Sequence, residues 1–259
     1  MLILKNNRII RKNNATISIF SEAFMYGFGV FETLRTYNSK TFELEAHINR
    51  LFNSAKEIKL KIPYSKKRIE TMVKKLVKLL KFENQLIKII STKEDLFIIS
   101  SKLKYKESLI KDGVAVKTIE LQRKLPSIKS ISYLSSYIAN NEAKNKNYYE
   151  ALLIDSHKNI SEGAYSNIFW FERDKLCTNS KNILHGITRE IVIKISPFKV
   201  KYKGIKLSSL LNKKEIFLTQ TSKGIIPVVK IDKTIINKGV PGHKTKELIK
   251  RFSDYALGT

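Results

Sequence analysis

The segment Leu125–Trp170 reads LPSIKSISYLSSYIANNEAKNKNYYEALLIDSHKNISEGAYSNIFW. Between Ile131 and Lys146 the apolar residues recur at helical spacing, which predicts a helix. Two apolar runs follow at 151–155 and 168–172, and their β-branched and aromatic residues predict strands. The segment therefore predicts a helix that leads into a sheet, with Glu162 in a polar stretch before the second strand.

The flanking sequence predicts a mixture of strands and helices. Two short apolar runs around Asn6-Asn7 are typical of a hairpin, and alternation predicts a second hairpin from strands at 30–37 and 41–44. Helical spacing begins at Glu45, ends near Pro63 and resumes at about Ser65. Further strands are predicted in QLIKIIST, DLFIISSKL, GVAVKTIEL, KVKYKGI, EIFLTQT, IPVVKID and TIIN, and further helices over 188–195 and 244–255. Because the alternation of strand and helix is irregular, the chain is predicted to be α+β.

The Pro-containing connection QRKLPS (122–127) is the predicted domain boundary. It separates a small N-terminal domain, 1–121, from a larger domain, 128–259. The length of 259 residues is sufficient for either one large core or two smaller ones.

Composition predicts a cytoplasmic protein. The single cysteine, Cys177, excludes an internal disulfide and is expected to serve packing, and no apolar run approaches the roughly 20 residues of a membrane span. The net charge of +26 leaves nucleic-acid binding open, although the basic residues are scattered along the chain. A solvated basic surface, or one suited to an anionic substrate, is the preferred interpretation.

Several separated motifs resemble the class IV aminotransferases, which are fold-type IV pyridoxal phosphate enzymes. This family contains branched-chain aminotransferases, D-amino acid aminotransferases and aminodeoxychorismate lyase. The motifs that carry the resemblance are YGFGVFETLR, HINRL, IKSISYLSSYIANNEA, EALLIDSHKNISEGAYSNIFW, HGITRE, EIFLTQTSKGIIPV and VPGHKTKEL. The resemblance implies a two-domain fold like that of D-amino acid aminotransferase, with a small N-terminal α/β domain. The larger C-terminal domain would combine a mixed sheet or barrel with helices.

The resemblance implies that pyridoxal 5'-phosphate is the cofactor and that Lys129 is its Schiff-base lysine. Glu162 matches the carboxylate that pairs with the pyridine nitrogen, since an opposite charge favours the protonated ring. Arg50 matches the arginine that chelates the phosphate with its planar guanidinium. Tyr133 matches the tyrosine that hydrogen-bonds the ring hydroxyl in branched-chain enzymes.

The remaining predicted site residues come from turns. Ile187 and Thr188 follow Gly186 at a helix start, where backbone N–H groups are free to bind phosphate. Thr221 and Ser222 match a second phosphate-binding turn that also faces the substrate. The resemblance places Tyr26 and Phe31 with them in the substrate pocket. No metal site is predicted, because the four histidines, His47, His157, His185 and His243, lack the spacing of metal ligands.

The sequence departs from the family in three places. Phe28 stands between the two glycines where relatives have Asp or Thr, and the second phosphate-binding turn reads Gln220-Thr221-Ser222. After QLIKIIST, relatives carry a longer loop with an arginine that grips the substrate carboxylate, but this chain has Lys93-Glu94-Asp95. Lys102 or Lys104 is expected to replace that arginine, unless the substrate is held differently.

The function predicted first is transfer of an amino group from an amino acid, branched-chain or other, to a 2-oxo acid. The alternative within the family is aminodeoxychorismate lyase, which releases pyruvate and gives 4-aminobenzoate. A remote alternative is a non-catalytic basic protein that binds nucleic acid. The resemblance also implies a homodimer with a shared active site, and the lack of a long apolar run predicts no membrane association.

Overall fold

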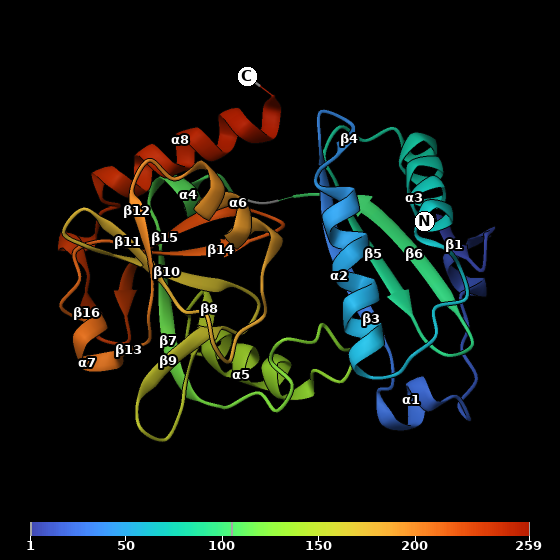
Figure 1. Cartoon of the computed structure of the whole chain (residues 1–259), viewed down its shortest axis with the longest axis horizontal. Coiled ribbons are helices and arrows are strands. Elements are labelled where there is room, and N and C mark those ends of the chain that lie inside the picture. The colour runs from blue at the N-terminus through green and yellow to red at the C-terminus, as the bar shows by residue number, and fades with distance from the viewer. Residues whose placement is uncertain (1, 105, 259) are drawn as a thin grey trace. The chain divides into compact units, whose positions relative to one another are not determined.

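The computed structural model describes residues 2–104 and 106–258, which fall into two compact units. The first unit comprises 1–104 and 128–133, and the second comprises 105–127 and 134–259. Each unit has its own sheet and its own hydrophobic core (Figure 1).

Among the described residues of the first unit, six strands form one antiparallel sheet. Their order is β2-β1-β6-β5-β3-β4. The strands are β1 (Leu2–Lys5), β2 (Arg8–Arg11), β3 (Val30–Tyr37), β4 (Lys40–Thr41), β5 (Gln85–Ser91) and β6 (Leu96–Lys102). Asn6 and Asn7 adopt positive φ angles of 47° and 68° and close the predicted first hairpin. A 3-10 turn, η1 (Lys12–Asn14), and a short helix, α1 (Glu22–Tyr26), connect β2 to β3.

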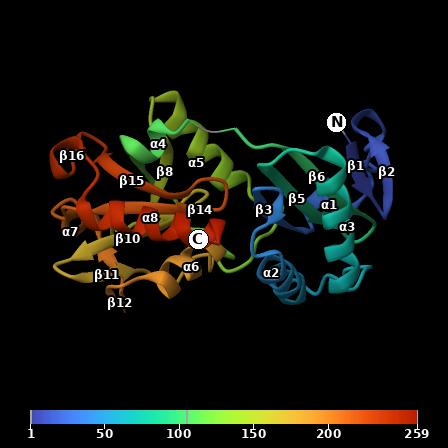
Figure 2. The same cartoon turned by 90° about the horizontal axis from the view of Figure 1, so that it is seen from above.

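Helices α2 (Leu44–Glu57) and α3 (Lys66–Leu80) pack on one face of this sheet (Figure 2). Apolar residues of both helices, including Leu51 and Leu76, share a core with Leu34 and Ile87 of the strands. The Ser65 hydroxyl accepts a hydrogen bond from the Arg68 N–H and so caps the start of α3. Because strand side chains alternate, every second residue of β3 and β5 faces away from these helices.

The second unit contains a ten-stranded mixed sheet among its described residues. The order is β12-β11-β10-β14-β15-β7-β8-β9-β13, with β16 paired to β15. The strands are β7 (Val114–Glu120), β8 (Glu150–Ile154), β9 (Asn159–Gly163), β10 (Asn167–Glu172), β11 (Lys175–Thr178), β12 (Lys199–Tyr202), β13 (Ile205–Lys206), β14 (Ile216–Gln220), β15 (Gly224–Ile231) and β16 (Thr234–Ile235). Side chains from both ends of the strand order, such as Ile205 and Trp170, share one core, so the sheet is strongly curved.

Helices cover the outside of the curved sheet. The helix α5 (Leu134–Asn145) packs on β8 through Ala139 and Ala143, whereas α6 (Ile187–Ile195) and α8 (His243–Leu257) contact each other and cover β14 and β15 (Figure 1). The ring of Phe252 on α8 fills the space beside Gly224. The remaining short elements are α4 (Ser108–Lys111), α7 (Leu207–Leu210) and η2 (Asn237–Gly239).

The α+β prediction is confirmed, and most strands and helices form where the sequence predicts them. The predicted strand over KVKYKGI is wrong in one respect, because it divides into β12 and the separate β13. Strands β9 and β11 were not predicted. The strand β7, predicted in the N-terminal domain, pairs in parallel with β8 and β15 and belongs to the second sheet. No helix among the described residues has the length and apolar character to cross a membrane.

Candidate functional site

The strand β3 places a carboxylate against α2. Glu32 shares a sheet face with Val30 and Leu34, so its side chain points into the packed layer between sheet and helix. There Arg50 donates two hydrogen bonds to it, from Nε to Oε1 at 2.7 Å and from Nη2 to Oε2 at 2.9 Å. His47 Nδ1 lies 2.8 Å from Oε2. The planar guanidinium of Arg50 is therefore held in one orientation.

Charge balance in this cluster depends on Arg50. Burial alone would raise the pKa of Glu32, but the charge and hydrogen bonds of Arg50, with a smaller effect of His47, lower it far below the ordinary range. Burial also lowers the pKa of His47, against the opposing effect of Glu32. Glu32 is thus an anion and His47 a neutral ring at pH 7. The strand sequence contained a signal for this cluster, namely an acid on the apolar face of a strand, which requires a buried partner.

Two glycines bring Lys129 beside β3. Gly27 has a φ of +64°, and a Cβ there would lie 3.1 Å from Cβ of Ser132. A Cβ on Gly29 would meet a side-chain carbon of Ile131 at 2.8 Å and a backbone oxygen at 2.9 Å. The segment 129–131 consequently runs along the edge of β3, where Phe31 donates its N–H to the carbonyl of Lys129 at 2.9 Å. The Ser54 hydroxyl accepts the N–H of Lys129 at 3.2 Å.

Three of the predicted site residues meet around the ring of Phe31. The Lys129 ammonium lies 4.5 Å from the ring centroid of Phe31, and the Tyr133 ring lies 5.4 Å from the same ring. Lys129 and Tyr133 are half-buried and Phe31 is buried. The predicted substrate residue Tyr26 ends α1 and is exposed. In the first unit, the Lys129 amine therefore packs against an aromatic ring that Tyr133 also contacts.

In the second unit Glu162 lies on β9 and is buried. Arg123 donates a hydrogen bond from its Nη1 to Oε1 of Glu162 at 2.5 Å. Oε2 accepts from the Asn167 amide at 3.1 Å and from the backbone N–H of Leu184 at 3.0 Å. A negative charge on Glu162 thus has a cation and neutral donors around it. Arg123 and Asn167 are site residues that the sequence did not predict.

The helix α6 begins next to Glu162. Gly186 is its N-cap and, without a side chain, cannot satisfy the first backbone N–H groups. Its α-carbon packs so closely on Asn167 that a Cβ would overlap the amide oxygen. Ile187 and Thr188 supply the first N–H groups of the helix, as predicted from the HGITRE motif. The same asparagine thus connects Glu162 to the start of α6.

Thr221 and Ser222 occupy the turn between β14 and β15. Gln220 organises this turn, since its Oε1 accepts from Tyr149 at 3.0 Å and from Ser222 at 3.1 Å. The strand register places Asn167 of β10 opposite Thr219 of β14. The predicted phosphate-binding turn and the surroundings of Glu162 therefore belong to one end of the same sheet.

A second buried acid supports the loop after Glu162. Glu150 begins β8, and its Oε1 accepts from the Tyr165 N–H at 2.6 Å and from the Ser166 hydroxyl at 2.9 Å. Burial raises the pKa of Glu150 to about 7, against these hydrogen bonds and the charge of Lys223. The close packing of Oε1 on Gly163 leaves no space for a side chain there. Glu150 thus fixes the backbone turn that follows Glu162.

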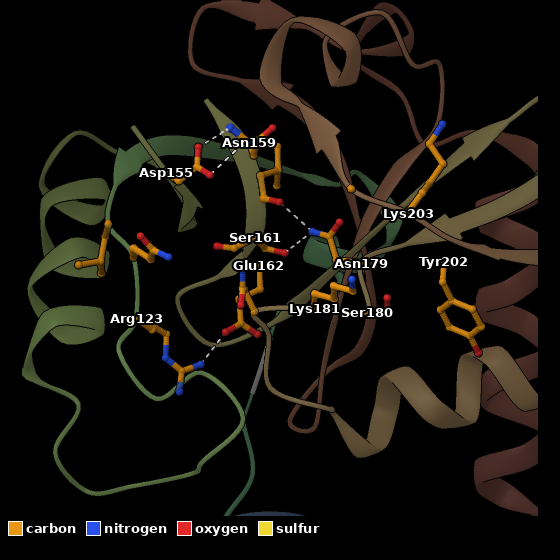
Figure 3. A pocket seen from close by; sticks show the side chains of 15 residues that line it. Arg123, Asp155, Asn159, Ser161, Glu162, Asn179, Ser180, Lys181, Tyr202 and Lys203 are labelled. Atoms are coloured by element: carbon orange, nitrogen blue, oxygen red, sulfur yellow. Dashed lines mark hydrogen bonds and ion pairs between the residues drawn. The ribbon is translucent and has the colours of Figure 1, made fainter. Parts of the chain in front are cut away.

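A pocket of about 460 Å³ opens beside Glu162 in the second unit. Figure 3 shows Arg123 pointing toward Glu162 at its rim, with Ser161 and Asn179 on the neighbouring wall. Ile187, Thr188 and Thr221 do not line this pocket. It therefore holds only part of the predicted cofactor-binding set of this unit. No group of three or more potential metal ligands gathers within the described residues.

Comparison with known proteins identifies the family. The family model described as Amino-transferase class IV matches residues 29–231, which is most of the chain. The chain belongs to the class IV aminotransferases. A protein of Methanocaldococcus jannaschii named as a branched-chain-amino-acid aminotransferase is 31% identical, over 98% of this chain and 96% of its own length. A D-alanine aminotransferase of Listeria innocua is 28% identical, over 97% of this chain and 95% of its own.

Solved structures of class IV aminotransferases share the whole fold. A structure from Thermotoga maritima, described as a branched-chain amino acid aminotransferase, has a TM-score of 0.91 at 26% identity and covers 100% of this chain and 96% of its own. The structure of the branched-chain aminotransferase of Thermoproteus uzoniensis with norvaline has a TM-score of 0.90 at 27% identity. The match covers 100% of this chain and 95% of that structure's chain. The predicted fold-type IV architecture is confirmed, and this class IV aminotransferase is an enzyme that transfers amino groups.

Proposed function

We propose that this aminotransferase binds pyridoxal 5'-phosphate through Lys129 and moves amino groups between an amino acid and a 2-oxo acid. The observation that carries the proposal is the environment of Lys129. Its backbone is fixed by Phe31 and Ser54, and its amine packs against an aromatic ring. A reactive amine must be held in one place to meet a carbonyl carbon repeatedly in the same geometry.

The side chains present fit a phosphorylated pyridine aldehyde. Arg50, oriented by Glu32, offers a planar cation of the kind that binds phosphate oxygens in pairs. The uncapped start of α6 at Ile187 and Thr188 offers backbone N–H groups at the positive end of a helix. Thr221 is proposed to add a further phosphate contact, and Tyr133 a hydrogen bond to the ring hydroxyl.

When bound, pyridoxal phosphate supplies a ring that accepts the electron pair left behind when the substrate loses its α-proton. We assign to Lys129 Nζ the removal and return of that proton. Glu162 is assigned to face the ring nitrogen, and its hydrogen bonds from Arg123, Asn167 and Leu184 keep its orientation fixed. Phe31, Tyr26, Thr221 and Ser222 are assigned to the substrate.

The relatives support an amino acid and a 2-oxo acid as the two substrates. Those compared above are named for branched-chain amino acids or for D-alanine, so the proposal covers both an apolar side chain and either handedness. They are all named as aminotransferases, which favours transamination over the lyase alternative. Family membership likewise favours catalysis over nucleic-acid binding as the function of this basic chain.

We further propose that the protein acts as a cytoplasmic homodimer. Support comes from an exposed apolar stretch around α1, where Phe20 is 86% exposed, Phe24 60% and Met25 57%. Clustered apolar side chains of this size are typical of a surface that another protein covers. Tyr26 ends this stretch, so a second copy seated there would border a predicted substrate residue.

The deciding experiment compares Lys129→Ala with Lys124→Ala after incubation with pyridoxal phosphate. Lys124, an exposed lysine in the connection 122–127 that precedes Lys129, serves as the matched control. The wild-type protein and the control should show a visible yellow absorbance band that borohydride fixes to a peptide containing Lys129, and Lys129→Ala should show none. A band of equal strength in Lys129→Ala would refute the assignment of Lys129.

Substrate choice follows from a survey of half-reactions. Each D- and L-amino acid is added to the yellow protein without an oxo acid, and the bleaching of the band is recorded. Conversion by one enantiomeric series identifies the handedness. Release of pyruvate from aminodeoxychorismate without bleaching by any amino acid would instead favour the lyase.

A further inference from the structure

Among the helices that the structure describes, α3 carries the largest net charge. Between Lys66 and Leu80 it has six basic residues and one acidic residue, which gives a net charge of +5. The helix α8 has the same length of 15 residues but contains four basic and two acidic residues. The helix α2, of 14 residues, contains two of each. The positive charge of the chain is therefore concentrated on α3 and is not a uniform excess of lysine.

The basic side chains of α3 lie on its exposed side. The buried residues of the helix are all apolar and belong to the core of the first unit: Ile69, Met72, Val73, Leu76 and Val77. Four exposed lysines recur at i, i+7, i+8 and i+11 and form what we call the lysine face: Lys67, Lys74, Lys75 and Lys78. At 1.5 Å of rise per residue, this face extends over about 17 Å of the helix axis.

Few acidic groups balance the lysine face. Lys74 pairs with Glu70 at 2.5 Å, and the two side chains are 56% and 40% exposed, so water screens the pair. Within the described residues, the side chains of Lys67, Lys75 and Lys78 form no hydrogen bond or ion pair. Like charges four residues apart, such as Lys74 and Lys78, destabilise a helix. Folding alone therefore does not explain the lysine face.

The first turn of α3 is also unfavourable for the helix itself. Lys66, Lys67 and Arg68 occupy this turn without an acidic residue. The partial positive charge at the start of a helix favours acidic side chains, so these cations oppose the helix dipole. A polyanion along the helix would reduce both this repulsion and the repulsion between the lysines. The charges of α3 are thus better suited to a bound anion than to the stability of the helix.

We propose that the lysine face of α3 binds the phosphate backbone of nucleic acid without sequence preference. Duplex DNA carries one charge per about 1.7 Å of its axis, so a face of about 17 Å lies within reach of several phosphates. Lysine is a point charge on a flexible stem, which suits phosphates in varied orientations. This is a further function of the chain, and it does not depend on cofactor binding by Lys129.

The surface of an anionic membrane offers the same charge, but α3 lacks the apolar face that membrane-surface helices use. Such helices bury their apolar side among the lipids. In α3 that side is packed on the sheet, where Met72 is 1% exposed and Leu76 0%. Leu79, at 47%, is the most exposed apolar residue of the helix. Nucleic acid, which requires only the charges, is therefore the ligand that α3 fits.

The test is a fluorescence anisotropy titration of a labelled DNA duplex with the full-length protein loaded with pyridoxal phosphate. For four neutralised phosphates, the affinity of the wild type should fall roughly 100-fold between about 50 and 200 mM salt. The lysine-face variant carries four substitutions: Lys67→Gln, Lys74→Gln, Lys75→Gln and Lys78→Gln. At about 50 mM salt it should bind about tenfold more weakly or less than that, and it should lose most of the salt dependence.

The matched control removes the same charge from four separate exposed positions of the second unit: Lys111→Gln, Lys201→Gln, Lys233→Gln and Lys250→Gln. It should keep the affinity and the salt dependence of the wild type. Equal weakening in the control and the lysine-face variant would overturn the proposal, because net charge would then determine binding. A wild-type protein that does not bind the duplex at low salt would also overturn it.

Vesicles of phosphatidylcholine and phosphatidylserine distinguish nucleic acid from a membrane surface. The wild type should bind the DNA duplex more tightly than these vesicles. Tighter binding to the vesicles, lost in the lysine-face variant, would overturn the assignment of nucleic acid as the ligand. Far-UV circular dichroism should be the same for the wild type and both variants, so that lost binding is not lost folding.

Discussion

Glu32 and Arg50 form a largely buried ion pair on which the proposed phosphate contact depends. Two charges out of water require each other, and removal of one partner typically costs about 3–5 kcal/mol because the other is left uncompensated. His47, a buried neutral ring, is the third member of this cluster and contacts Glu32. A test of the proposed phosphate contact should therefore keep the charge of Arg50 and change only its shape.

Arg50→Lys makes that change. Lysine keeps a positive charge beside Glu32 but loses the planar fork that binds two oxygens at once. We expect the dissociation constant of pyridoxal phosphate to rise about tenfold, as for loss of one charge-assisted hydrogen bond. Absorbance titration measures it, with the exposed Arg68→Lys on α3 as control. An unchanged constant would show that Arg50 does not bind the phosphate.

Glu150 gives the folded protein a pH dependence of defined sign. Its pKa rises from 4.5 to about 7 on burial, so between these values the folded state keeps a proton that the unfolded state has lost. The free energy of unfolding therefore falls as pH rises through this window. A shift of this size corresponds to about 3 kcal/mol.

Glu150→Gln removes the titration and keeps the acceptor that Tyr165 and Ser166 use. Between pH 4.5 and pH 8 the wild type should lose about 3 kcal/mol more of its free energy of unfolding than Glu150→Gln. Urea unfolding at a series of pH values measures the difference. Glu142, an exposed residue that forms an ion pair with Lys146, is the control. Glu142→Gln should show the same pH dependence as the wild type. Parallel curves for wild type and Glu150→Gln would refute the buried proton.

At the scale of single elements, the start of α6 couples helix geometry to Glu162. Gly186 has a φ of −70°, which any residue adopts, so its lack of a side chain matters only because Asn167 packs there. Asn167 in turn donates to Glu162 and to the carbonyl of Leu184. One atom added at Gly186 should therefore disturb Glu162 without straining the helix.

Gly186→Ala tests this coupling. The new Cβ would overlap Oδ1 of Asn167, so the amide must move and its hydrogen bond to Glu162 must lengthen. We expect affinity for pyridoxal phosphate to fall about tenfold, the effect of one hydrogen bond to a charged group. Gly204→Ala is the control, because a Cβ there meets no atom within 4 Å. Equal affinities of the two variants for pyridoxal phosphate would show that the start of α6 does not influence cofactor binding.

The sequence predicted elements well where one period dominated, and less well elsewhere. The helix α3 has a capping serine and an uninterrupted apolar stripe, so its bounds follow from the residues alone. The strand β9 has no such signal, because its buried positions include Glu162 and Gly163. The membership of β7 in the second sheet depends on parallel pairing with distant segments, which local periodicity does not encode.

The candidate site likewise contains residues that the sequence predicts and residues that only the fold reveals. Lys129, Glu162 and Arg50 stand in motifs and could be predicted from resemblance, and their roles remain predictions. The partners that orient them could not be predicted in this way. Arg123 and Asn167 reach Glu162 through the fold, from 39 and 5 residues away in the chain.

At the scale of the whole molecule, the exposed apolar stretch around α1 predicts an association between copies. The double variant Phe20→Ser, Phe24→Ser should shift the dimer toward monomer, since it removes two large apolar side chains from the proposed interface. Sedimentation velocity at several concentrations measures the shift. Ile235→Ser, which changes a side chain 64% exposed on β16, is the control. If the double variant and the control contain the same fraction of dimer, the interface lies elsewhere.

The alternation of Phe31 and Glu32 along β3 also limits how relatives of this chain can differ in length. An insertion or deletion of a single residue within β3 would move every following side chain to the opposite face of the sheet, so that the positions of Phe31 and of Glu32, which binds Arg50, would be exchanged. Changes of length are expected instead in the turn of Asn38 and Ser39, which both have positive φ angles, because no such parity applies there. Natural variation in this hairpin should therefore concentrate at its tip, and the strand before it should keep its count of residues.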